Sequence, residues 1–178
     1  MAHEECAECG FDGADVDDAD LLEALRSLGP TWSALLVRAG DDLRTRPEPE
    51  VWSAIEYAAH SRDILALHAF GIEQALTVDE PAFPAIDGDA LVEAAATTYG
   101  DADPILVSRE LGDQASAMAD LADRVDAGGW TRGINIGEDR SDVRGLLEHG
   151  LHDSSHHLAD VERGIVQLRA RGGSAQQP

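Results

Sequence analysis

The stretch "VRGLLEHGLHDSSHHLADVERG", Val143–Gly164, combines a helical apolar period with four of the seven histidines of the chain. Its apolar residues recur every three or four positions and form one stripe, made of Val143, Leu146, Leu147, Leu151, Leu158 and Val161. This spacing is typical of an amphipathic helix. Because Asp142 can cap the first turn and glycines follow Arg171, we expect the last helix over Val143 to about Arg171.

Three further helical regions precede it. A leucine stripe begins at Asp18, and Gly29-Pro30 inside it predicts either two pieces or a kink. A second helix is expected from about Val51 to Leu76, and a third region over 89–126 is divided at Asp103, which reads as a new N-terminus before proline. Four main helices joined by short to medium loops favour an all-α, antiparallel four-helix bundle.

The domain organisation follows from these elements. We expect an acidic N-terminal segment with a Cys-x-x-Cys motif over 1–17, a metal-binding four-helix domain over 18–171 and a flexible tail over 172–178. With 178 residues, 43% apolar but only 4% aromatic, the chain suits one domain whose core is mainly aliphatic.

The chain has 35 acidic residues against 13 arginines and no lysine, which gives a formal net charge of −22. Such a charge repels phosphate backbones and anionic lipid head groups, so binding to nucleic acid or to membranes is not expected. A halophilic surface is an alternative explanation of the acidity. No apolar run approaches the roughly 20 residues that cross a bilayer, and the first residues lack a secretory apolar region, so a cytoplasmic protein is expected.

The histidines suggest a metal site. His152 and His156 are one helical turn apart and can therefore bind one ion from the same face. On a helical wheel, however, they lie nearly opposite the apolar stripe, so that face borders a recessed cleft or is solvated. A surface role without any metal is the alternative.

His60 is the candidate for a third ligand. With Glu56 and Asp63 it forms a polar strip on the otherwise apolar second helix, and such a strip is costly unless it faces water, a partner or an ion. Either carboxylate could orient the His60 ring. A core histidine satisfied by its neighbours is the alternative.

Two segments together resemble a known family. "PEVWSAIEYAAHSRDIL" (Pro49–Leu65), followed about ninety residues later by "WTRG" and by the histidine-rich stretch, is similar to the DinB/YfiT-like metalloenzymes, especially their actinobacterial branch. That superfamily includes the mycothiol-dependent maleylpyruvate isomerases, and the resemblance covers roughly Leu21 to Leu168. It implies a four-helix bundle with one metal-binding histidine on the second helix and an H-x-x-x-H pair on the last.

Carried over by position, the resemblance implies His60, His152 and His156 as metal ligands, with His68, His149 and His157 as neighbours. Three histidines with an open position suit Zn²⁺, and Ni²⁺ is the other candidate. The resemblance further implies a thiol-dependent S-transferase or isomerase that uses a low-molecular-weight thiol such as mycothiol and a small-molecule electrophile. A non-catalytic metal-binding stress or sensor protein is the alternative, and pairing of two copies through a helix face is left open.

Cys6 and Cys9 have the spacing of half a zinc knuckle, with His3 nearby. Two free thiols on a flexible end are the simpler interpretation, because a second cysteine pair is missing. A redox pair fits less well without a βαβ pattern. If the segment folds back over the bundle, a thiolate could reach the histidine-bound metal.

Overall fold

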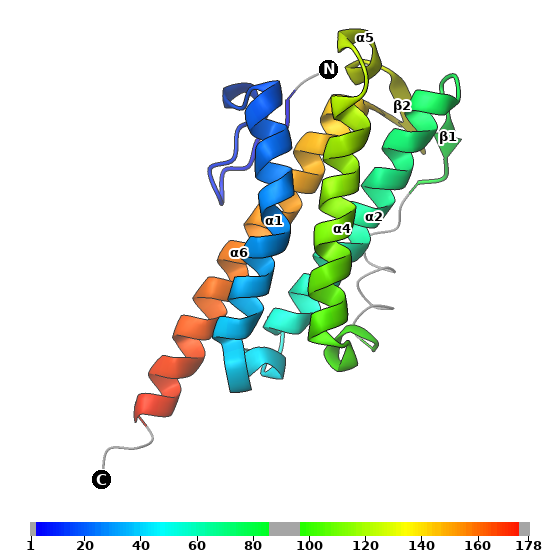
Figure 1. The fold of residues 1–178 in the computed structure, drawn as a ribbon. Coiled ribbons are helices and arrows are strands. Elements are labelled where there is room, and N and C mark those ends of the chain that lie inside the picture. Colours follow the sequence, from blue (N-terminus) through cyan, green and yellow to red (C-terminus); the bar gives the residue numbers. More distant parts are fainter. Residues whose placement is uncertain (1–2, 86–96, 175–178) are drawn as a thin grey trace.

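The computed structural model describes residues 3–85 and 97–174, and four long helices dominate it (Figure 1). These are α1 (Asp18–Ala39), α2 (Ala54–Thr77), α4 (Pro104–Asp123) and α6 (Val143–Ser174). The four-helix bundle expected from the sequence is confirmed. The first part of the third predicted region, residues 89–96, lies outside the described residues.

The bundle does not follow a simple up-down-up-down path. Each of α1 and α2 packs between α4 and α6, so that α1 and α2 face each other across the diagonal. In Figure 1 α1 and α6 run in one direction, whereas α2 and α4 run in the other. Each helix therefore has one antiparallel and one parallel neighbour. Arg26 near the start of α1 pairs with Asp120 near the end of α4, as this arrangement requires.

The predicted starts of the first helix, of the helix after Asp103 and of the last helix agree with the structure, whereas the second helix begins at Ala54 rather than at Val51. Asp103 Oδ1 accepts hydrogen bonds from the first amides of α4, and Asp142 Oδ1 accepts one from Gly145 at the start of α6. The two-piece alternative for the first helix is wrong, because α1 continues through Pro30 as one helix. Gly29 in α1 lies so close to α4 that a Cβ there would meet the Gly112 Cα at 2.7 Å.

A small sheet at one end of the bundle was not predicted. β1 (Ala82–Phe83) pairs in parallel with β2 (Gly133–Ile136), and β2 pairs antiparallel with β3 (Asp139–Asp142). We expected only an irregular connection there. Ile134 is buried in the core, and Gly137 at the hairpin turn has a φ of +61°. Short helical pieces complete the described fold: Gly13–Asp15, Gly40–Arg44, Tyr99–Asp101 and α5 (Ala127–Trp130).

The N-terminal segment is folded back onto the start of α6. The Glu4 backbone N–H donates to Glu148 Oε2 (3.0 Å), and His3 Nδ1 lies 2.7 Å from Glu148 Oε1. Glu148 is itself 1% exposed. The segment therefore covers the outward face of α6, the face that carries His152. Among the described helices, none is both long and apolar enough to cross a membrane.

Candidate metal centre

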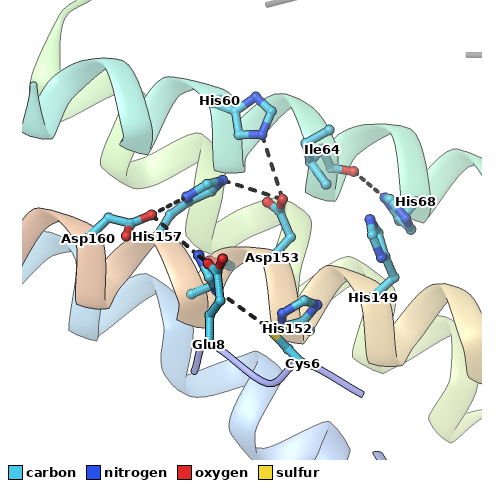
Figure 2. A network of polar contacts seen from close by, with 12 residues as sticks. Cys6, Glu8, His60, Ile64, His68, His149, His152, Asp153, His157 and Asp160 are labelled. Carbon is cyan, nitrogen blue, oxygen red and sulfur yellow. Dashed lines mark hydrogen bonds and ion pairs between the residues drawn. The ribbon is translucent and has the colours of Figure 1, made fainter. Parts of the chain in front are cut away.

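Three groups of ligand-type side chains lie along α6; Glu4, His149 and His152 form one, and the other two alternate along the helix. Asp153 and His157 face α2, where they meet His60; we call these three residues the α2/α6 centre (Figure 2). His152 and His156 face the N-terminal segment, where they meet Cys6 and Cys9. One residue of helix turns a side chain by about 100°, so neighbouring positions on one helix serve different sites.

In the α2/α6 centre the two ring nitrogens converge on one carboxylate. His60 Nε2 lies 3.7 Å and His157 Nε2 lies 3.5 Å from Asp153 Oδ1. Two ligand atoms on one ion at about 2.1 Å are roughly 3.0–3.4 Å apart, so the observed spacing needs a shift of a few tenths of an ångström. The three residues can therefore bind one divalent cation.

The tautomer of His157 supports this interpretation. His157 Nδ1–H donates to Asp160 Oδ2 (3.0 Å), and a carboxylate can only accept, so the neutral ring carries its lone pair on Nε2. That lone pair faces the Asp153 carboxylate, and the repulsion is relieved only by a proton or a cation between them. The buried Asp153 Oδ2 also has no hydrogen-bond partner among the described residues. The donor set thus fits a bound ion.

Without an ion, charge pairing stabilises the centre. Burial raises the pKa of Asp153, but hydrogen bonds and charges from His157 and His60 outweigh burial and hold that pKa well below its usual range. Burial lowers the pKa of His157, whereas the carboxylates of Asp153 and Asp160 raise it to above its ordinary value. A divalent cation would take the place of the proton between the ring and the carboxylate.

Aromatic rings enclose the centre without closing it. The Trp52 ring meets the His60 ring at 5.3 Å between centroids, and Tyr57 lies 4.9 Å from the His157 ring. The side chains of His60 and Asp153 nevertheless keep 17% of their surface exposed. Three protein ligands and access from solvent are the features of a catalytic rather than a structural metal site.

The second group, which we call the cysteine–histidine cluster, consists of Cys6, Cys9, His152 and His156. One ligand atom from each lies within 4.8 Å of all the others, and Cys6 Sγ is 3.8 Å from His156 Nδ1. Backbone N–H groups of Cys9 and Glu8 point at the Cys6 sulfur and, against a raising effect of burial, lower its pKa to about 6.

Glu4 joins the two histidines at the start of this face. It accepts hydrogen bonds from His152 Nδ1–H (2.7 Å) and from His149 Nδ1–H (3.0 Å). His68 stacks on His149, and burial together with the His149 charge lowers the pKa of His68 to about 4, so that ring is neutral. His68 Nδ1–H donates to the Ile64 carbonyl and is therefore already satisfied.

The structure divides the three sequence-predicted ligands between the two groups. His60 lies in the α2/α6 centre, whereas His152 and His156 lie in the cysteine–histidine cluster. The face of His152 is neither an open cleft nor solvated, because the N-terminal segment covers it. His157, expected as a neighbour, is in the α2/α6 centre, and Asp153 in the same centre was not predicted from the sequence.

The two carboxylates expected to orient His60 are engaged elsewhere. Glu56 accepts from Arg46 and from Ser53 at the start of α2. Asp63 accepts from Arg62 and from the Tyr99 hydroxyl. The polar strip of α2 thus serves three separate purposes. Only its middle residue faces α6.

The fold and the two histidine-bearing groups define a four-helix bundle with candidate metal sites on its last helix. The sequence matches no protein-family model and no curated protein. The structure is similar to that of YfiT from Bacillus subtilis, with a TM-score of 0.75 and 16% sequence identity over 94% of this chain and 93% of that chain. YfiT is described as "a probable metal-dependent hydrolase with an unusual four-helix bundle topology". The likeness shows a YfiT-like bundle fold, as the resemblance implied.

Proposed function

We propose that this chain is a metal-dependent enzyme of the DinB/YfiT type whose reaction centre is formed by His60, Asp153 and His157. The convergence of two imidazole nitrogens on a half-buried carboxylate, one oxygen of which is buried and unpartnered among the described residues, carries the proposal. These residues replace the predicted trio as ligands of one ion. A divalent ion held there would lower the pKa of a water or thiol in its open position towards neutrality.

The protein groups around the centre have definable tasks. Asp160 fixes the His157 tautomer, so that Nε2 rather than Nδ1 faces the ion. Trp52 and Tyr57 exclude water from one side and hold the two rings in place. This arrangement leaves the remaining side for a substrate.

Space for a substrate lies one helical turn away. An open pocket of about 570 Å³ lies between the N-terminal segment, α2, α6 and the β2–β3 hairpin, and its lining includes Ile64, His68, His149 and Arg140. Arg140 pairs with Glu80 at the surface. A substrate carboxylate could bind Arg140 in place of Glu80, because the Arg140 guanidinium can donate hydrogen bonds to either carboxylate.

Thiol-dependent S-transfer or isomerisation with a mycothiol-like thiol is the reaction that the sequence resemblance supports. Hydrolysis is the reaction that the description of YfiT suggests. Both use the same centre and differ in whether a thiol or water is activated. A metal-binding stress or sensor protein without turnover is the alternative.

The test is to load purified protein with Zn²⁺ or Ni²⁺ and incubate it with mycothiol and an electrophile such as monobromobimane. A parallel reaction contains a p-nitrophenyl ester without thiol. We expect metal-dependent thiol consumption that His60→Ala and Asp153→Asn abolish and that Asp113→Asn, a change of an exposed carboxylate on α4, leaves intact. Ester cleavage alone would assign the hydrolase. Full metal binding with neither reaction would favour the sensor.

A further inference from the structure

The N-terminal turn presents both cysteines to α6. The Gly10 N–H donates to the Cys6 carbonyl (2.9 Å), and the Cys6 N–H donates to the Phe11 carbonyl (2.9 Å), which closes a tight loop around Cys6–Cys9. Gly10 has a φ of +77°, a conformation that favours glycine.

The hydrogen bonding of His152 makes Nε2 the ring nitrogen that can bind a metal ion. Because Glu4 can only accept, His152 Nδ1 carries the hydrogen and Nε2 carries the lone pair. His152 Nε2 is buried and has no hydrogen-bond partner among residues 3–85 and 97–174. Phe11 stacks on the ring with centroids 5.2 Å apart and holds its plane. A buried, unpartnered lone pair on a ring that belongs to a group with two thiols fits a bound cation.

His156 supplies the fourth donor from the next turn of α6. Its Nδ1 lies 3.8 Å from Cys6 Sγ, and its Nε2 lies 3.7 Å from Asp160 Oδ2. For a tetrahedral zinc ion with Zn–S of about 2.3 Å and Zn–N of about 2.05 Å, the S···N distance is about 3.5 Å. The Cys6–His156 pair therefore needs a contraction of about 0.3 Å around the ion, and all four ligand atoms lie within 4.8 Å of one another.

We propose that Cys6, Cys9, His152 and His156 bind Zn²⁺ as a closed tetrahedral site that fastens the N-terminal segment to α6. Two sulfurs and two imidazoles are the donor set that selects zinc among common divalent ions, and four protein ligands leave no open position. Binding of the ion releases the thiol protons to solvent. The site shares no ligand with the α2/α6 centre, so the inference does not rest on the proposed function.

The proposed zinc site lies next to the α2/α6 centre and would hold the residues of that centre in position. Asp153 and His157, which belong to the α2/α6 centre, each directly follow one of its histidines in the sequence. Asp160 Oδ2 is also close to both His157 Nδ1 and His156 Nε2, at 3.0 and 3.7 Å. Zinc bound on one face of α6 thereby holds the helix in the rotation that directs Asp153 and His157 towards α2.

The experiment uses the full chain, reduced and freed of metal by a chelator that is then removed. Reaction of Cys6 and Cys9 with a disulfide reagent is followed with and without Zn²⁺. Since only ion-free protein reacts, the rate should fall about 100-fold when free Zn²⁺ is 100 times its Kd. Unchanged thiol reactivity in the presence of Zn²⁺ would overturn the site.

Cobalt(II) then serves as a spectroscopic probe of the ligands. The parent should show thiolate-to-cobalt charge transfer and the strong visible bands of a tetrahedral ion. Cys6→Ser/Cys9→Ser should lose the thiolate-to-cobalt charge transfer, whereas the matched change Glu5→Gln of an exposed carboxylate in the same segment should keep it. Far-ultraviolet circular dichroism of each variant checks the bundle. A parent protein that binds cobalt without a charge-transfer band would refute the assignment.

The variant Asp153→Asn separates this site from the α2/α6 centre. It should keep the thiolate band while its metal stoichiometry falls from two ions to one. If the parent binds one ion and shows the thiolate band, the zinc site is confirmed and the proposed function fails. If Asp153→Asn also abolishes the thiolate band while circular dichroism is unchanged, the two groups are one site and this inference is overturned.

Discussion

The hydrogen bond between Trp32 and Ser154 fixes how α6 is turned against α1. Trp32 Nε1–H donates to Ser154 Oγ at 2.8 Å, and both residues are 0% exposed. Ser154 directly follows Asp153, so this bond holds α6 in the rotation that points the α2/α6 centre towards α2. Ser154→Ala removes the acceptor and leaves the indole N–H buried without a partner.

The magnitude follows from that desolvated donor. An unsatisfied buried donor costs about 1–3 kcal/mol, and a domain of this size loses roughly 2–4 °C of Tm per kcal/mol. We therefore expect Ser154→Ala to lower the free energy of unfolding by about 1–3 kcal/mol and Tm by roughly 2–12 °C. The assay is urea denaturation followed by circular dichroism and Trp fluorescence.

Ser155→Ala is the matched control, because it makes the same change of helix propensity at a half-buried neighbour. It should leave stability unchanged or raise it by about 0.5 kcal/mol. In the background of Trp32→Phe, which removes the donor, Ser154→Ala should cost at least about 1 kcal/mol less than in the parent. Equal stabilities of Ser154→Ala and Ser155→Ala would refute this reasoning.

Three further changes probe other parts of the fold. Burial raises the pKa of Glu56, yet hydrogen bonds from Arg46 and Ser53 lower that pKa below the ordinary 4.5. Glu56→Gln should therefore lower the free energy of unfolding by about 1–3 kcal/mol at pH 7. In urea titrations at different pH, this loss should shrink as the pH falls below 4.5. Gly29→Ala should destabilise more than Gly112→Ala by calorimetry, because the added Cβ meets backbone at 2.7 Å rather than 3.2 Å; the reverse order would contradict the packing. Asp160→Asn should weaken metal affinity at both groups by about tenfold in competition with a chromophoric chelator, and an effect on neither would contradict its orienting role.

Much of the fold could be predicted from local signals. The apolar stripe of α6 and the capping side chains of Asp103 and Asp142 are local features of the sequence. The structure has helices at the positions that these features predict. The β2–β3 hairpin was missed because four-residue strands give little alternation. The turn glycine Gly137 and the buried Ile134 were its available signals.

Histidine as the main ligand type of the site was predicted from the sequence, but the face of α6 that turns towards α2 was not. An i, i+4 pair on α6 was expected at His152 and His156, yet Asp153 and His157 have the same spacing. On the helical wheel the latter pair flanks the apolar stripe, whereas the former lies opposite it. That difference was a usable signal for which pair turns towards α2. The return of the N-terminal segment depends on contacts with Glu148, more than 140 residues away, which periodicity cannot reveal.

The most direct test of the central claim is an anomalous-difference map at the absorption edge of the metal, from crystals of protein purified without chelator. We expect a peak about 2.0–2.2 Å from His60 Nε2, His157 Nε2 and an Asp153 oxygen. A metal-containing protein whose map shows no ion among these three side chains would contradict it.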